Sequence, residues 1–177
     1  MKEIFEMYAK YNQAGNKGIY DLLTKLDNED REKDRGSYYG SLSGLLRHVM
    51  GGTFFFMGMY KSALTGNAGA QKALASLEGI VLPEGKLSGA QWKELGSLLE
   101  KIDAAYVGMA AALEEANLKA PVKIEWYGGN PAEVPLSFLL HQLVVHNTHH
   151  RGQISQILDS LQIKNDYSGI NIAFMPR

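Results

Sequence analysis

Four of the five histidines in this 177-residue chain lie between positions 141 and 150. The surrounding segment reads HQLVVHNTHHRGQISQIL, and its apolar residues recur at helical spacing, which places the histidines on one predicted helix. Imidazole nitrogens bind zinc, nickel, copper and iron, so such a cluster is typical of a metal site. The chain contains no cysteine, and any metal must therefore be held by nitrogen and oxygen.

The helical repeat of about 100° per residue separates inward from outward histidines. Measured from His146, the apolar stripe spans roughly 20° to 80°, and His150, at about 40°, lies at its centre. His149, at about −60°, lies at the edge, and His141, at about −140°, is expected to face solvent. His146 and His150, spaced i and i+4, can both reach one ion. The residues that define the stripe are Leu136, Leu139, Leu143, Ile154, Ile157 and Leu161.

A third inward histidine comes from a different part of the chain. His48 lies on the apolar face of a predicted helix, between Leu45 and Gly52. Burying an imidazole without a partner is costly, so three inward histidines on two facing helices favour a set of metal ligands over isolated core histidines. Gly51 and Gly52 would let another helix come close, and simple helix packing explains them equally well. No HExxH sequence is present, which excludes a zincin-type protease.

Four long helices are expected to position these residues. Apolar spacing predicts them over 2–26, 41–64, from Ser88 to about 113, and from about Val134 to Leu161. Ser88 and Gln91 form a capping-box pattern, and Pro135 suits the first turn of the last helix. This order predicts an all-α four-helix bundle that forms a single domain over 1–177.

The connections between these helices have weaker signals. A short helix is expected at 71–77, and a loop or small hairpin between Pro121 and Pro135. The charged run 27–35 is expected to be a solvated loop, and the residues 165–177 to be an irregular tail.

Composition excludes several classes of function. Eighteen basic and nineteen acidic side chains give a net charge of −1, which leaves no broad positive field for nucleic acid or an anionic membrane. No apolar stretch reaches the roughly 18–20 residues of a membrane span, and the N-terminus lacks the apolar core of a signal peptide. We therefore expect a cytoplasmic protein with a small-molecule partner, and neither nucleic acid nor membrane as partners.

The segment HNTHHRGQISQIL resembles the HxxxHRGQ signature on the last helix of the DinB-like superfamily, and LLRHVMGGTFFF resembles that family's second helix with its single histidine. The order of elements fits over nearly the whole chain. The resemblance implies a four-helix bundle in which His48, His146 and His150 bind a divalent ion, zinc or nickel. It also implies a homodimer. Some relatives are S-transferases or isomerases that use a low-molecular-weight thiol such as mycothiol or bacillithiol.

Two residues beside these histidines are candidates for binding a cofactor. Gln153, at about −20°, is expected to contact a metal-bound ligand or to fix a histidine ring, unless it only borders the apolar stripe. Arg151 is expected to bind a substrate carboxylate or to form a structural ion pair with Asp159 or Asp166.

Aromatic residues form two further groups. The run Phe54–Met59 is expected to be core, and its surplus apolar side is a candidate dimer surface. Trp126 and Tyr127 precede the last helix and are expected either to rim the metal pocket or to cap the end of the bundle.

Three hypotheses for the function remain. The first is a metal-dependent thiol S-transferase or hydrolase, in which the metal activates a thiol or water that attacks a small molecule. The second is a non-enzymatic, stress-related bundle that binds metal or a small ligand. In the third, the histidines are structural and no metal binds. Because the chain has no cysteine, any thiol in the first hypothesis comes from outside it.

Overall fold

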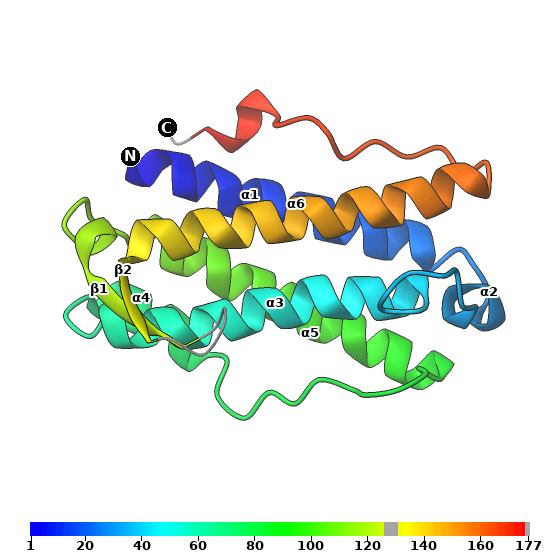
Figure 1. The fold of residues 1–177 in the computed structure, drawn as a ribbon, viewed down its shortest axis with the longest axis horizontal. Coiled ribbons are helices and arrows are strands. Elements are labelled where there is room, and N and C mark those ends of the chain that lie inside the picture. Colours follow the sequence, from blue (N-terminus) through cyan, green and yellow to red (C-terminus); the bar gives the residue numbers. More distant parts are fainter. Residues whose placement is uncertain (126–130, 176–177) are drawn as a thin grey trace.

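The computed structural model of the chain describes residues 1–125 and 131–175, which are mostly helical (Figure 1). The helices predicted from apolar spacing are present as α1, α3, α5 and α6, and the prediction of an all-α bundle is confirmed. In chain order the elements are α1 (Lys2–Leu23), α2 (Asn28–Glu32), α3 (Leu42–Ala63), α4 (Ala68–Ala75), α5 (Gly89–Ala111), η1 (Asn117–Lys119), β1 (Pro121–Ile124), β2 (Ala132–Pro135), α6 (Leu136–Ser160) and η2 (Ile172–Phe174).

The four long helices run along the length of the molecule (Figure 1). Helix α3 packs chiefly against α6, and α1 packs chiefly against α5. Burial of the apolar side chains between them is the main stabilising contribution to the fold. The hydroxyl of the fully buried Tyr60 donates to the carbonyl of Leu139 at 3.0 Å, which ties α3 to α6 deep in this core. None of the described helices has the length and apolarity needed to cross a bilayer.

Capping residues and a small hairpin set the starts of the helices. Ser88 and Gln91 form the predicted capping box of α5. The hairpin between Pro121 and Pro135 is an antiparallel pair, β1 with β2, in which these two prolines lie opposite one another. The amide of Leu136, the first residue of α6, donates to the carbonyl of Ala120 at 2.9 Å. This end of the sheet therefore holds the start of the helix that carries most of the histidines.

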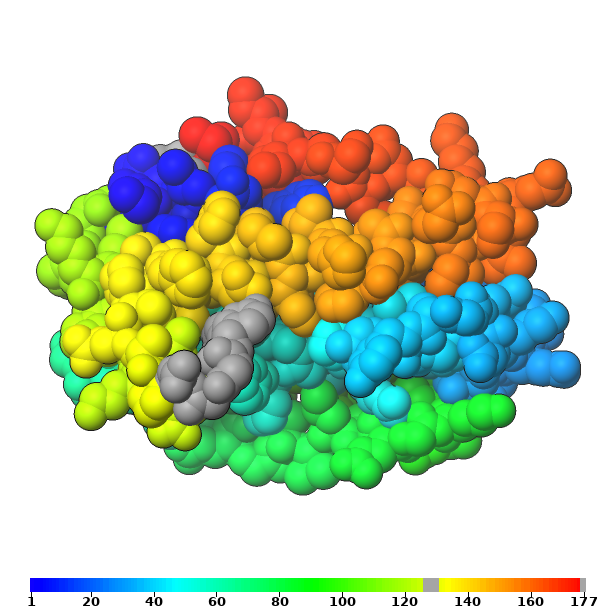
Figure 2. All heavy atoms as spheres, in the orientation of Figure 1, coloured from blue at the N-terminus to red at the C-terminus, as the bar shows by residue number. Residues whose placement is uncertain are grey.

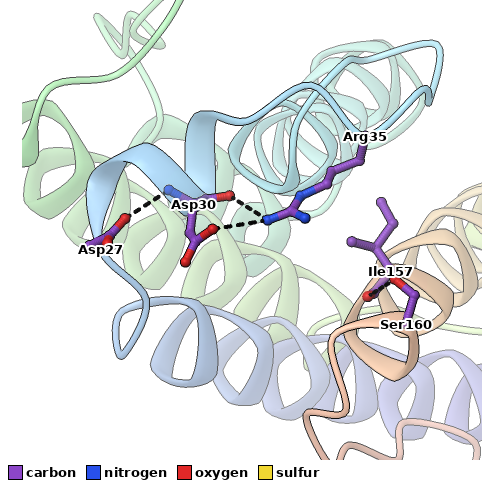
Figure 3. A network of polar contacts seen from close by, with 5 residues as sticks. All are labelled: Asp27, Asp30, Arg35, Ile157 and Ser160. Carbon is purple, nitrogen blue, oxygen red and sulfur yellow. Dashed lines mark hydrogen bonds and ion pairs between the residues drawn. The ribbon is translucent and has the colours of Figure 1, made fainter.

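The prediction that the run 27–35 is only a solvated loop is wrong. Residues within it form α2, whose N-cap Asp27 accepts a hydrogen bond from the amide of Asp30 at 2.8 Å. Arg35 donates to both the carbonyl and the carboxylate of Asp30, at 3.3 and 3.2 Å, across from the last turn of α6 (Figure 3).

Arg31 in α2 is buried, and it links this short helix to α1. Its guanidinium donates to the carbonyl of Leu23, the last residue of α1, and to that of Leu26 just beyond it, and lies 4.8 Å from the centroid of the Trp92 ring. The last carbonyls of a helix have no partners within the helix, so a cation placed there satisfies them. A run of alternating charges does not reveal which charge turns inward.

The residues after α6 return along the bundle toward α1. The hydroxyl of Tyr11 donates to the carbonyl of Tyr167, and the hydroxyl of Ser155 donates to Asn165 at 2.6 Å. Figure 2 shows this C-terminal tail, in red, lying over α1. The tail is mostly irregular, as expected, apart from the short η2.

Candidate metal centre

His48 of α3 and His146 and His150 of α6 lie together where these two helices pack. One ligand atom from each ring lies within 4.8 Å of the other two. The Nε2 atoms of His48 and His146 are 2.9 Å apart. Two imidazoles on one tetrahedral zinc ion keep their nitrogens roughly 3.3 Å apart, given Zn–N distances of about 2.0–2.1 Å. The three rings therefore converge at a spacing that suits one divalent ion.

A glycine makes room for one of these rings. A Cβ at Gly52 would lie 2.5 Å from Cε1 and 3.0 Å from Nδ1 of His146, closer than real side chains come. Gly52 is one turn beyond His48 on α3, so the same face of this helix carries one histidine and accommodates another. At Gly52 the other helix does come close, since α6 places the His146 ring where a Cβ would be.

The outer nitrogens of two rings are held by side-chain amides. Nδ1 of His146 lies 2.9 Å from Oδ1 of Asn147, and Nδ1 of His150 lies 2.6 Å from Oε1 of Gln153. Hydrogen bonds of this kind fix the tautomer and orientation of a metal-binding imidazole. A ring whose Nδ1 donates to such an amide oxygen keeps its lone pair on Nε2, the nitrogen that is then free to bind an ion.

Tyr39 packs against the cluster from the loop before α3. Its ring stacks on that of His48, with centroids 3.7 Å apart and 17° between the planes, and it meets His150 edge-on at 5.4 Å. This contact holds His48 in place and shields one side of the cluster.

All three rings favour the neutral form that binds metals. Burial and, to a lesser extent, the neighbouring His150 and His146 together lower the pKa of His48 from 6.5 to about 4. Burial also lowers the pKa of His146 and of His150, although the bonds to Asn147 and Gln153 oppose this shift. At neutral pH the cluster therefore offers unprotonated nitrogens.

The depressed pKa of His48 makes the stability of the metal-free protein depend on pH. The unfolded chain takes up a proton near pH 6.5 while the folded ring stays neutral to about pH 4. The unfolded state therefore binds more protons in this window, and stability is complete above it and falls as the pH drops through it. Because the ring is partly exposed, we expect a loss on the order of 1–2 kcal/mol.

Urea unfolding at a series of pH values in the presence of a chelator measures this dependence. In a His48→Gln variant, the free energy of unfolding should fall less steeply with pH between pH 6.5 and 4. If the wild-type and variant slopes are equal, the prediction fails.

A pocket of about 520 Å³ opens beside the cluster. It is lined by His48, Gly52, Phe55, Phe56, Gln142 and His146, so its walls are largely apolar apart from the histidines and one amide. A second pocket of about 630 Å³ shares His48 and is lined by Tyr39, Arg47, Phe54 and the 81–85 segment. A ligand the size of a small metabolite can therefore reach His48 by either pocket.

Comparison with known proteins places the chain in a family. The model of the DinB family matches residues 1–161, from the start of α1 to the end of α6. The chain belongs to the DinB family. Neither the curated proteins nor the solved structures include a match to it. The histidines of this DinB protein all lie within the matched segment, whereas most of the tail lies beyond it.

The remaining histidines of this DinB protein stay outside the cluster. His141 and His149 are both exposed, as the helical angles predict for His141. The ring of His149 lies against that of His150, with centroids 4.8 Å apart, but it is not part of the three-histidine group.

The two candidate cofactor-binding residues take different positions. Gln153 bonds to His150, which agrees with the expectation that it fixes a histidine ring. Arg151 is buried and points toward α1, where it donates to Asn12 at 2.8 Å. The expected ion pair of Arg151 with Asp159 or Asp166 does not occur in the described part of the chain.

The aromatic groups divide in a similar way. Phe56 and Met57 are core, as expected, whereas Phe55 is 58% exposed at the rim of the pocket. Trp126 and Tyr127, which were candidates for the pocket rim, lie outside the described residues.

Sequence reasoning missed Tyr39, because this residue lies in an irregular segment that has no periodicity to indicate its direction. It also missed the buried polar side chains behind His146. A signal existed for these: Asn12 and Asn16 occupy the face of α1 that also buries Ile19 and Leu23.

Proposed function

We propose that this DinB protein is a divalent-metal-dependent enzyme that acts on a small molecule. It either transfers a low-molecular-weight thiol to that molecule or hydrolyses it with water. The observation that carries the proposal is the convergence of three neutral imidazoles beside an open pocket. Among the described residues, no Asp, Glu or further His joins this group as a fourth ligand. Three protein ligands and an open position are typical of catalytic zinc sites, whereas structural sites are closed by four.

The residues present fit a resident zinc or nickel ion. When bound, such an ion acts as a Lewis acid and lowers the pKa of a thiol or water at its open position. Asn147 and Gln153 keep the rings of His146 and His150 oriented toward the ion. Phe55 and Phe56 give the adjoining pocket an apolar wall, which suits the uncharged part of a small substrate.

Thiol transfer is favoured over hydrolysis by what lines the pocket. The described residues of the 520 Å³ pocket include no Asp or Glu that could serve as a general base for water, and Glu84 lines only the second pocket. A thiol ionises far more readily than water and needs no such base. The chain itself has no cysteine, so the thiol is a separate co-substrate.

Turnover assays on protein loaded with zinc or nickel test this proposal. A panel of low-molecular-weight thiols is paired with small electrophiles, and the assay is repeated after chelation. We expect metal-dependent loss of free thiol, and we expect the absorption spectrum of cobalt-substituted protein to change when the thiol is added. Tight metal binding with neither turnover nor a thiol-dependent spectrum would instead support a non-enzymatic metal-binding or ligand-binding bundle.

We also propose that the protein acts as a homodimer in the cytoplasm. The exposed Phe138 and Val145 of α6 support a contact between copies, because large apolar side chains at the surface of a helix are often covered by a partner. Sedimentation equilibrium of the full chain measures this directly, and a monomer at micromolar concentration would refute it.

A further inference from the structure

A buried polar network lies behind His146, in the centre of the bundle. We define it as Asp103 of α5, Asn12 and Asn16 of α1, and Asn147 and Arg151 of α6. Each of these five residues is at most 4% exposed. Burying so many polar groups is costly unless every one is paired, so the network needs a reason beyond filling space.

The charged members orient the amide of Asn12. Nδ2 of Asn12 donates to Oδ1 of Asp103 at 2.9 Å, and Nη1 of Arg151 donates to Oδ1 of Asn12 at 2.8 Å. A guanidinium can only donate, and the carboxyl oxygens of Asp103 accept from both Asn12 and Asn16. If the amide of Asn12 were flipped, its Nδ2 would face the donating guanidinium of Arg151. Its Oδ1 would then face the accepting carboxyl of Asp103. Its amide therefore has one allowed orientation.

Burial dominates the electrostatics of this charged pair. It raises the pKa of Asp103 to about 7, against the lowering effects of the bond from Asn16, the charge of Arg151 and the bond from Asn12. Burial also lowers the pKa of Arg151. Burial thus opposes both charges, and the hydrogen bonds and opposite charges within the network offset only part of its effect.

Asn147 passes this orientation on to the metal centre. Its Nδ2 donates to Oδ1 of Asn12 at 2.8 Å and to Oγ1 of Thr53 at 2.9 Å. The hydroxyl of Thr53 already donates to the carbonyl of Val49 at 3.1 Å, so its oxygen can only accept here. Both hydrogens of Nδ2 are therefore used. Oδ1 of Asn147 is left facing Nδ1 of His146 and must accept from it.

We infer that the buried polar network presets the tautomer and ring orientation of His146, so that Asn12 and Asn147 are positioning residues of the metal centre. The hydrogen of His146 is held on Nδ1, and Nε2 keeps its lone pair. The 2.9 Å contact between the Nε2 atoms then requires a hydrogen on Nε2 of His48 in the metal-free protein. The effect on metal affinity rests on the proposed function, whereas the tautomer belongs to the metal-free chain.

Long-range proton–nitrogen NMR of the metal-free, ¹⁵N-labelled chain reads each histidine tautomer directly. We expect His146 to carry its hydrogen on Nδ1 and His48 to carry its hydrogen on Nε2. A His146 ring with its hydrogen on Nε2, or with both tautomers populated, overturns the inference without any variant. A merely structural role for the network would leave the tautomers of His146 mixed.

Asn12→Ala and Asn16→Ala form a matched pair of variants. Both truncate a buried amide that donates to Asp103 from α1, but only Asn12 bonds to Asn147. We expect Asn12→Ala to mix the His146 tautomers and to lower zinc affinity about 10–100-fold, and we expect Asn16→Ala to affect both much less, because it leaves the bond between Asn12 and Asn147 in place. Equal effects of the two variants on the tautomer and on the affinity would contradict the inference.

Two further outcomes separate the inference from the proposed function. If the wild-type chain binds no zinc, the proposed function fails. The inference is then still tested by the histidine tautomers of the metal-free chain. If Asn12→Ala does not fold, Thr53→Val, which is similar in shape, removes one acceptor of Asn147 Nδ2 instead. An unchanged His146 tautomer in that variant would overturn the inference, and a mixed one would support it.

Discussion

His146→Ala is expected to lower the affinity for zinc or nickel by more than about 100-fold, because loss of a direct ligand should exceed the 10–100-fold cost of losing an outer hydrogen-bond partner. His146 lies 2.9 Å from His48 through their Nε2 atoms, and both rings line the same pocket. Its loss would leave two imidazoles on different helices. Competition with a chromophoric chelator measures the affinity, and circular dichroism confirms that the variant is folded.

His149→Ala is the control for this variant. His149 lies on the same helix and against His150, yet it is exposed and outside the three-histidine group. We expect its metal affinity to equal that of the wild type. If His149→Ala and His146→Ala lose affinity to the same extent, the assignment of the ligand set is wrong.

Gly52→Ala is expected to lower metal affinity about 10–100-fold without adding or removing any ligand. The new Cβ would lie 2.5 Å from Cε1 of His146, so the ring must turn or α3 must move away from α6. Alanine in place of a helical glycine stabilises a helix by roughly 0.5–1 kcal/mol, which offsets part of the strain. We therefore expect a large loss of metal affinity and only a small change in the free energy of unfolding.

Gly58→Ala separates these two effects. Gly58 lies on the same helix, and a Cβ there meets nothing within 4 Å. This variant should gain the helical stabilisation and bind metal like the wild type. Chelator competition and urea unfolding of both variants give the comparison, and wild-type affinity in Gly52→Ala would contradict the proposed role of His146.

The histidine cluster was predictable because direction along a single helix is simple geometry. The angle between residues identifies His146 and His150 as inward and His141 as outward, and His48 follows from the apolar face of its own helix. The fold was predictable for the same reason, since each long helix shows its apolar stripe. The direction of an amphipathic helix face can therefore be read without knowing what lies opposite.

Contacts between distant segments could not be predicted in this way. Asn12 and Asp103 each stand out as a polar residue on an apolar face, but they are 91 positions apart. The spacing within one helix does not indicate which residue of another helix it contacts. Arg151, which follows His150, was expected to bind a substrate carboxylate or to pair with Asp159 or Asp166, and its partner Asn12 was not foreseen. One residue along a helix is about 100° of rotation, which turns its side chain toward α1 and away from the pocket.

The separation of His48 from His146 along the chain has a consequence for how the protein is made. The two residues are 98 positions apart, so a nascent chain has no complete metal centre until α6 has been synthesised and packed against α3. Such long-range contacts form late in folding, because the entropy of closing a long loop opposes them. We therefore expect the ion to enter after the bundle has formed, and to prolong the lifetime of the folded protein without accelerating its folding.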